Sequence, residues 1–115
     1  MDDYKLTLRK LALRDDRFIE SLLREERSSA ALAGIDPVAH ALLRIAALIA
    51  VDAAPPSYMS AVEDGRHAGA SEDEMVGTLI AVIPIVGVAR VVSAAPNLAL
   101  ALGYDVSDAF ELVDG

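Results

Sequence analysis

Residues 53–74, with the sequence AAPPSYMSAVEDGRHAGASEDE, decide the fold. Ser71 is followed three residues later by Glu74, which is a capping box: each side chain accepts a hydrogen bond from a backbone N–H at the start of a helix. Gly69 is suited to end a preceding helix, because glycine adopts the left-handed conformation without strain. The stretch therefore predicts a short helix over about 58–68, with Ser57 as its N-cap, and a second helix after Ser71.

Toward the N-terminus, the segment 36–50 predicts a longer helix. Asp36 is a good N-cap, Pro37 suits the first helical position, and Pro55-Pro56 follow the end of the segment. Apolar residues lie on most sides of this segment, which indicates a buried helix. Two further helices are expected before it, one over 3–13 and one capped by Asp15 or Asp16.

Toward the C-terminus, Pro84 is expected to end or kink the helix that starts after Ser71. The next helix runs from about 85 or 88 to 102, and Gly103 ends it. Asp105 or Ser107 caps a last short helix over 108–113. No segment shows the period-two alternation of a half-buried strand. We therefore expect an all-α fold, a single-domain helical bundle of about six helices over 1–115.

The composition indicates self-association. The 115 residues are 54% hydrophobic, and the mean hydropathy is +0.39. A domain of this size buries a smaller fraction of its surface than a larger one does. The excess apolar surface is expected to lie in a subunit interface, so we expect a homo-oligomer.

The charge argues against nucleic acid and membrane partners. The formal net charge is −8, and the basic cluster Lys5, Arg9, Lys10 and Arg14 is flanked by acidic residues. Both a phosphate backbone and an anionic membrane would be repelled. The uncharged run 75–89 is shorter than the roughly 20 apolar residues that a membrane span needs. The N-terminal sequence does not have the pattern of a secretory signal, and the expected location is the cytoplasm.

The order of three segments carries a family resemblance. These are DPVAHALLRIAALIA (36–50), HAGASEDEMVGTLIAV (67–82) and PIVGVARVVSAAPNLALALG (84–103). The D-P helix start, the A-G-A-[ST]-x-[DE]-E turn and the P-x-V-G-x-x-R segment resemble the carboxymuconolactone decarboxylase family, also called alkylhydroperoxidase D-like, over about 36–103. The resemblance implies that family's helical arrangement and assembly as a trimer or hexamer.

The resemblance also implies where the redox site of the family would lie. That site is a Glu followed by C-x-x-C-x-x-x-H. Counted back from the A-G-A turn, the Glu falls at Leu42, the two Cys at Ala54 and Ser57, and the His at Ala61. The chain has no Cys, so thiol–disulfide exchange is excluded. The His-containing acid/base site of the decarboxylase branch is also in doubt, because Ala61 replaces the His.

Tyr58 and Ser57 are the candidate catalytic residues. A Tyr hydroxyl in a dry pocket could donate a hydrogen bond to a carbonyl or a lactone. The alternative is a packed ring with its tip in water. Ser57 as a nucleophile would need His40 or His67 as a base, and a simple N-cap is the alternative.

The candidate binding residues are His40, Arg44 and Arg90. His40 and Arg44 are four positions apart on one helical face, where they could hold an anion or transfer a proton. Alternatively, Arg44 pairs with an acid or a partner subunit. Arg90 lies among apolar residues expected to be buried, and it could pair across an interface or hold a substrate carboxylate.

No metal site and no cofactor are expected. Glu63 and His67 give only two ligands, and zinc usually takes three or four from the protein. We expect a non-redox protein of this family without the usual catalytic groups, acting as a ligand-binding or structural homo-oligomer. The alternative is an acid/base enzyme, a decarboxylase, isomerase or lactone-acting enzyme, with a relocated site for a small carbonyl or lactone.

Overall fold

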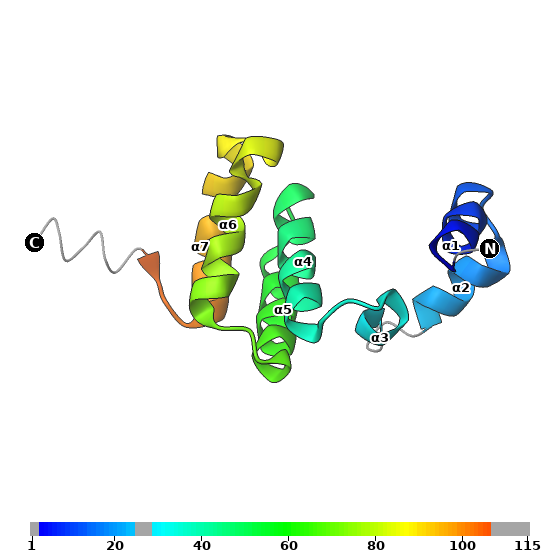
Figure 1. Cartoon of the computed structure of the whole chain (residues 1–115). Helices are drawn as coiled ribbons and strands as arrows, with labels where there is room; N and C mark the ends of the chain where they lie inside the picture. The colour runs from blue at the N-terminus through cyan, green and yellow to red at the C-terminus, as the bar shows by residue number, and fades with distance from the viewer. Residues whose placement is uncertain (1–2, 25–28, 107–115) are drawn as a thin grey trace, which may run out of the picture. The chain divides into compact units, whose positions relative to one another are not determined.

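The computed structural model describes residues 3–24 and 29–106 (Figure 1). All regular secondary structure among them is α-helical, which confirms the all-α prediction, and it forms seven helices. One of these, α3 (Ser29–Ala33), was not predicted as a helix. The helix expected over 108–113 lies outside the described residues. No helix of the described part is long and apolar enough to cross a bilayer.

Contacts within the chain divide it into two compact units, Met1–Ile35 and Asp36–Gly115. The prediction of one domain over 1–115 stays a prediction. The first unit holds α1 (Asp3–Ala12), α2 (Asp16–Arg24) and the short α3. α1 and α2 are joined by a turn at Arg14, which has a φ of 53°.

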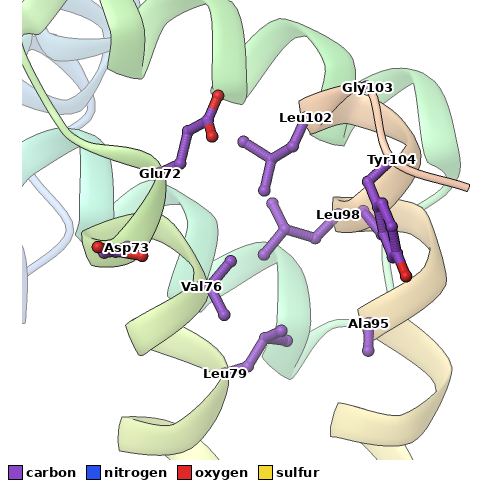
Figure 2. Close-up of a pocket in the computed structure, with 10 residues that line it drawn as sticks. Glu72, Asp73, Val76, Leu79, Ala95, Leu98, Leu102, Gly103 and Tyr104 are labelled. Atoms are coloured by element: carbon purple, nitrogen blue, oxygen red, sulfur yellow. The ribbon is translucent and has the colours of Figure 1, made fainter. Parts of the chain in front are cut away.

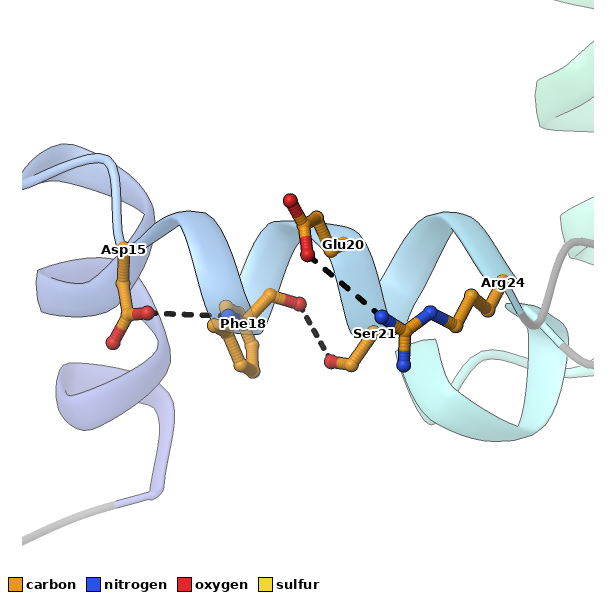
Figure 3. A network of polar contacts seen from close by, with 5 residues as sticks. All are labelled: Asp15, Phe18, Glu20, Ser21 and Arg24. Carbon is orange, nitrogen blue, oxygen red and sulfur yellow. Dashed lines mark hydrogen bonds and ion pairs between the residues drawn. The ribbon is translucent and has the colours of Figure 1, made fainter.

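The start of α2 is capped by Asp15 rather than Asp16. The Phe18 backbone N–H donates a hydrogen bond to Asp15 Oδ1 at 3.1 Å (Figure 3). One turn later, Glu20 and Arg24 form an ion pair four positions apart, with 3.7 Å between Oε2 and Nη2 (Figure 3). Both side chains are well exposed, so this pair adds little to stability.

The second unit is a bundle of four helices, α4 (Pro37–Ala50), α5 (Pro55–Ala68), α6 (Glu72–Val86) and α7 (Val88–Leu102). α4 packs on α5 and α6, and α7 packs on the same two helices. In Figure 1 these four helices run alongside one another, in cyan-green to orange. The bundle agrees with the coarse fold prediction. The alkylhydroperoxidase D-like arrangement stays a prediction.

The caps that the sequence predicts for α4 and α6 are present. Asp36 Oδ2 accepts hydrogen bonds from the N–H groups of Val38 and Ala39 at 3.1 and 3.2 Å. Ser71 Oγ accepts from the Glu74 N–H at 3.0 Å, and Glu74 Oε1 accepts from the Ser71 N–H at 2.9 Å. These bonds satisfy backbone donors that a helix start leaves without partners.

The interior of the bundle is filled by side chains from all four helices. The largest fully buried ones are Ile45, Ile49, Tyr58, Val62, Met75 and Leu98. Close packing explains why position 65 is a glycine: a Cβ there would lie 3.2 Å from Met75 Sδ. The side chain of any other residue at this position would therefore press on the core.

Pro84 does not end α6, and α7 begins at Val88, the later of the two predicted starts. α6 continues through Pro84 to Val86, and it ends at Gly87, whose φ is 90°. Proline removes one backbone donor, but the two residues after it keep the helical conformation here. The left-handed φ of Gly87, which glycine adopts readily, is what separates α6 from α7.

Candidate functional site

The candidate residues Ser57 and Tyr58 lie in the first turn of α5, which begins earlier than the sequence indicated. The helix starts at Pro55, and its N-cap is Ala54, which offers no side-chain hydrogen bond. Ser57 is therefore inside the helix and exposed, and the N-cap prediction was wrong. The reason is Pro55-Pro56: their fixed φ suits the first helical turn, and they need no acceptor for a backbone N–H.

Tyr58 is fully buried, with 0% of its surface exposed. It belongs to the same apolar cluster as Ile45, Val62 and Leu98. Its hydroxyl has no hydrogen-bond partner among the described residues. Burial, and secondarily the charge of Asp52, raises the pKa of Tyr58 above its usual 10.0. The hydroxyl therefore keeps its proton at neutral pH, so it can donate a hydrogen bond but cannot act as a base.

Two polar residues that were not singled out from the sequence, Asp52 and Ser93, form a hydrogen bond between the end of α4 and α7. Asp52 follows α4 with a φ of 54°, and Ser93 Oγ of α7 donates a hydrogen bond to Asp52 Oδ1 at 3.0 Å. This bond ties the end of α4 to α7 across 41 positions of sequence. No local pattern links residues that far apart, and the pair was therefore missed.

The positions that correspond to the family's redox groups do not converge on an open site. Ala61 is 2% exposed and packs in the same cluster as Tyr58. Leu42 is half-buried against that cluster, while Ala54 and Ser57 are exposed. The packing around Tyr58 and Ala61 is thus apolar and closed.

Arg44 has a partner within the chain. Its Nη1 donates to Asp64 Oδ2 of α5 at 2.9 Å, and the two side chains are 37% and 52% exposed. This agrees with the structural alternative for Arg44. His40 lies half-buried one turn earlier in α4.

Arg90 is exposed near the start of α7, and no described residue pairs with it. The expectation that it lies among buried side chains holds only in part: Val91 next to it is buried, whereas Val88 and Val92 are 65% and 64% exposed. The structure does not bring Arg90 together with Arg44, whose charge is taken up by Asp64. Arg90 and Ser93 are one helical turn apart in α7 and therefore lie on the same side of it.

Arg66 joins three helices and was not singled out from the sequence. Its Nη2 donates to Glu72 Oε1 at 3.3 Å and to the Leu102 carbonyl at 3.1 Å. The bond to Leu102 satisfies a carbonyl at the end of α7 that has no helical partner. No cluster of three potential metal ligands is found among the described residues.

Two of the grooves on the described part of the bundle are large enough for a ligand, and Tyr58 does not line these two. The α6–α7 groove has a volume of about 580 Å³, and Figure 2 shows its lining. Val76, Leu79, Leu98 and Leu102 give it an apolar wall, and Glu72 lies at its edge. The second groove, between α4 and α6, has about 480 Å³ and is lined by Leu42, Leu43 and Val82 among others. Both volumes are within the range of small-molecule sites.

Comparisons of the chain with models of protein families, with curated proteins and with solved structures found no match. The resemblance to the carboxymuconolactone decarboxylase family therefore rests on the sequence motifs alone and stays a prediction.

Proposed function

We propose that this chain is a non-redox protein that resembles the carboxymuconolactone decarboxylase family and acts as a ligand-binding or structural homo-oligomer. The resemblance makes a trimer or a hexamer the expected assembly. One observation carries the proposal: large apolar side chains remain exposed on two adjacent helices of the bundle, α6 and α7.

The most exposed of these α6–α7 residues are Ile80, Ile85, Val88 and Val92, with 69%, 85%, 65% and 64% of their surfaces exposed. Fully covering a Val or Ile side chain stabilises by about 1.5–3 kcal/mol before the costs of association are subtracted. Apolar side chains gathered on a surface are typical of an interface. A second copy of the chain is a natural partner, since small apolar domains have surplus surface.

The closed packing around Ala61 and Tyr58 supports a role without the family's chemistry. The chain has no Cys, and the position of the family's His is a buried Ala at 2% exposure. The α6–α7 groove supports the ligand-binding part of the proposal, because its mainly apolar wall suits a small apolar molecule.

The test is the molar mass of the full chain by light scattering, with Ile80→Gln as the variant. Met59→Gln is the matched control, because Met59 is 56% exposed but lies on α5. Ile80→Gln is expected to lower the mass and Met59→Gln to leave it unchanged. Equal masses for the wild type and Ile80→Gln would remove α6 from the interface and count against the proposal.

A second candidate function is favoured by the Tyr58 hydroxyl. A buried hydroxyl without a partner is costly, and such costs are often found at functional sites. An acid/base enzyme acting on a small carbonyl or lactone would use Tyr58 as a hydrogen-bond donor. The other polar groups of such a site would be Arg90 and Ser93 of α7, together with Asp52, which accepts a hydrogen bond from Ser93. Arg90 would hold a substrate carboxylate.

Thermal shifts with small lactones and keto acids separate the two candidates. The enzyme candidate predicts a rise in melting temperature that Tyr58→Phe abolishes and Ser57→Ala does not. A panel that leaves the wild-type melting temperature unchanged would favour the structural role.

A further inference from the structure

The α6–α7 groove lies within the second unit, and most of its wall is apolar. Val76 and Leu79 line it from α6, and Leu98 and Leu102 line it from α7 (Figure 2). Leu98 is 1% exposed and belongs to the core of the bundle, so the core holds this part of the wall in place. A molecule that enters the groove therefore meets a largely preformed apolar surface, as in most small-molecule sites.

The charged residues that line the groove are both acidic, Glu72 and Asp73 at the start of α6. Glu72 already has a partner, because its Oε1 lies 3.3 Å from Arg66 Nη2. The side chain of Asp73 is exposed and has no hydrogen bond or ion pair to another described residue. A carboxylate in a first turn also stabilises its own helix, so Asp73 alone does not make a site. Beside an apolar groove of ligand size, however, it selects the charge of the molecule that fits.

Tyr104 lines the groove from the other side. It follows the end of α7, and Figure 2 shows its ring on the α7 side, with Glu72 and Asp73 on the α6 side. Its backbone N–H donates a hydrogen bond to the Ala99 carbonyl at 2.8 Å, which fixes the chain at this point. An aromatic ring offers a contact surface to an apolar body, and its face attracts a cation.

The charge of the second unit favours a cationic ligand as well. Residues 36–115 contain three Lys or Arg and eleven Asp or Glu, so the formal charge of −8 belongs to this unit. Such a surface raises the local concentration of cations and lowers that of anions. No Lys, Arg or His lines the α6–α7 groove to offset this effect for a carboxylate or a phosphate.

We propose that the α6–α7 groove binds a small molecule with an apolar body and one protonated amine. The body packs against Leu79, Leu98 and Leu102, and the ammonium group lies beside Asp73. This inference rests on the ligand-binding part of the proposed function and names the chemical class of the ligand. An aliphatic amine such as that of lysine has a pKa of about 10.4, so it carries its charge at neutral pH.

The first experiment compares three probes that share one apolar body and differ in charge: phenylbutylamine, phenylbutanol and phenylbutyrate. Titration calorimetry measures their affinities for the full chain. The amine is expected to bind about two- to fivefold more tightly than the alcohol, which is the effect of one exposed ion pair. Raising the salt concentration from about 0.05 M to about 0.5 M should remove this advantage. Phenylbutyrate should bind most weakly, and binding of this anion as tight as that of the amine would overturn the inference.

The second experiment tests the place of the charge. Asp73→Asn is expected to lower the affinity for the amine about two- to fivefold and to leave the affinity for the alcohol unchanged. Glu63→Gln is the matched control, because it removes the same charge from an exposed position on α5 that does not line the groove. Equal losses for the two variants would mean that only the general field of the protein acts on the amine, and would overturn the inference.

The third experiment tests the place of the apolar body. Ala95→Leu adds bulk inside the α6–α7 groove, and Ala39→Leu does the same in the α4–α6 groove. The first variant is expected to abolish binding of the amine and of the alcohol, and the second to leave both unchanged. The opposite result would place the probes in the α4–α6 groove and overturn the inference. Circular dichroism checks that both variants are folded.

Nuclear Overhauser effects give the same information without a substitution in the groove. In the wild-type chain, the ring of bound phenylbutylamine is expected to show effects to the methyl groups of Leu79 and Leu102. Effects to Leu42 and Leu43 in their place would assign the probe to the α4–α6 groove and overturn the inference.

The outcomes separate this inference from the proposed homo-oligomer. An assembly of several chains that binds none of the three probes overturns the inference and leaves the homo-oligomer standing. A monomeric chain that binds the amine in preference to the alcohol, with the expected loss for Asp73→Asn, overturns the homo-oligomer and supports the inference.

Discussion

Arg44 of α4 and Asp64 of α5 form a hydrogen-bonded ion pair, with 2.9 Å between Nη1 and Oδ2. The arginine that the sequence offered as an anion-binding residue is thus held by a carboxylate 20 positions away. Its charge is compensated within the bundle, and an incoming anion would have to compete with Asp64.

The first prediction concerns this pair. Asp64→Asn is expected to lower the free energy of unfolding by less than about 1 kcal/mol, because both side chains are partly exposed to water. Urea unfolding measures it, with Glu63→Gln, an exposed neighbour on the same helix, as the control. A loss several times larger would mean that the pair is shielded from water, as at an interface.

Tyr58→Phe is expected to keep or slightly raise stability. It removes a hydroxyl that has no partner among the described residues and leaves the ring in place. Tyr58→Ala should instead cost about 3–5 kcal/mol, because it leaves a cavity in the core. If Tyr58→Phe loses more than about 1 kcal/mol, the hydroxyl has a partner in solution.

The raised pKa of Tyr58 predicts a loss of stability at high pH. The unfolded chain releases the phenolic proton near pH 10.0, whereas the folded chain holds it to higher pH. Above pH 10.0 the folded state therefore binds more protons than the unfolded state, and the free energy of unfolding falls as the pH rises. The contribution of Tyr58 is complete below that pH. Urea unfolding from pH 8 to 11 should show a steeper decline for the wild type than for Tyr58→Phe, and parallel declines would contradict the account.

Replacing Ser57 of α5 and Ser71, the N-cap of α6, by Ala is expected to change the free energy of unfolding by different amounts. Ser71→Ala removes an N-cap bond and should cost about 0.5–2 kcal/mol. Ser57→Ala should cost almost nothing, because Ser57 is exposed inside the first turn of α5 and is not its cap. Chemical unfolding of both variants decides this, and a comparable loss for Ser57→Ala would restore the sequence-based assignment of the cap.

The parts of this structure that were predictable depend on neighbouring residues. Asp36 with Pro37, and Ser71 with Glu74, act within one helical turn, so their spacing is sufficient to place α4 and α6. Ser57 was wrongly predicted as the N-cap of α5, because the sequence contains two local signals for a helix start, the serine and the proline pair before it. The helix begins at the prolines, so Ser57 lies inside it.

The site could be predicted much less well, since it depends on contacts between distant segments. The hydrogen bond between Asp52 and Ser93 joins residues 41 positions apart, and no periodic pattern in the sequence predicts it. Arg90 was expected among buried residues because its neighbours are apolar. An apolar neighbourhood in sequence indicates which side chains avoid water, but it does not tell whether their own chain or a second copy covers them.

The most direct test of the central claim is the molar mass of the purified wild-type chain, measured by sedimentation equilibrium over a wide range of concentration. The account predicts an assembly with a mass several times that of the 12.1 kDa chain, with a trimer or a hexamer expected. A mass of one chain at every concentration would contradict it, because the exposed apolar residues of α6 and α7 would then have no second copy to cover them.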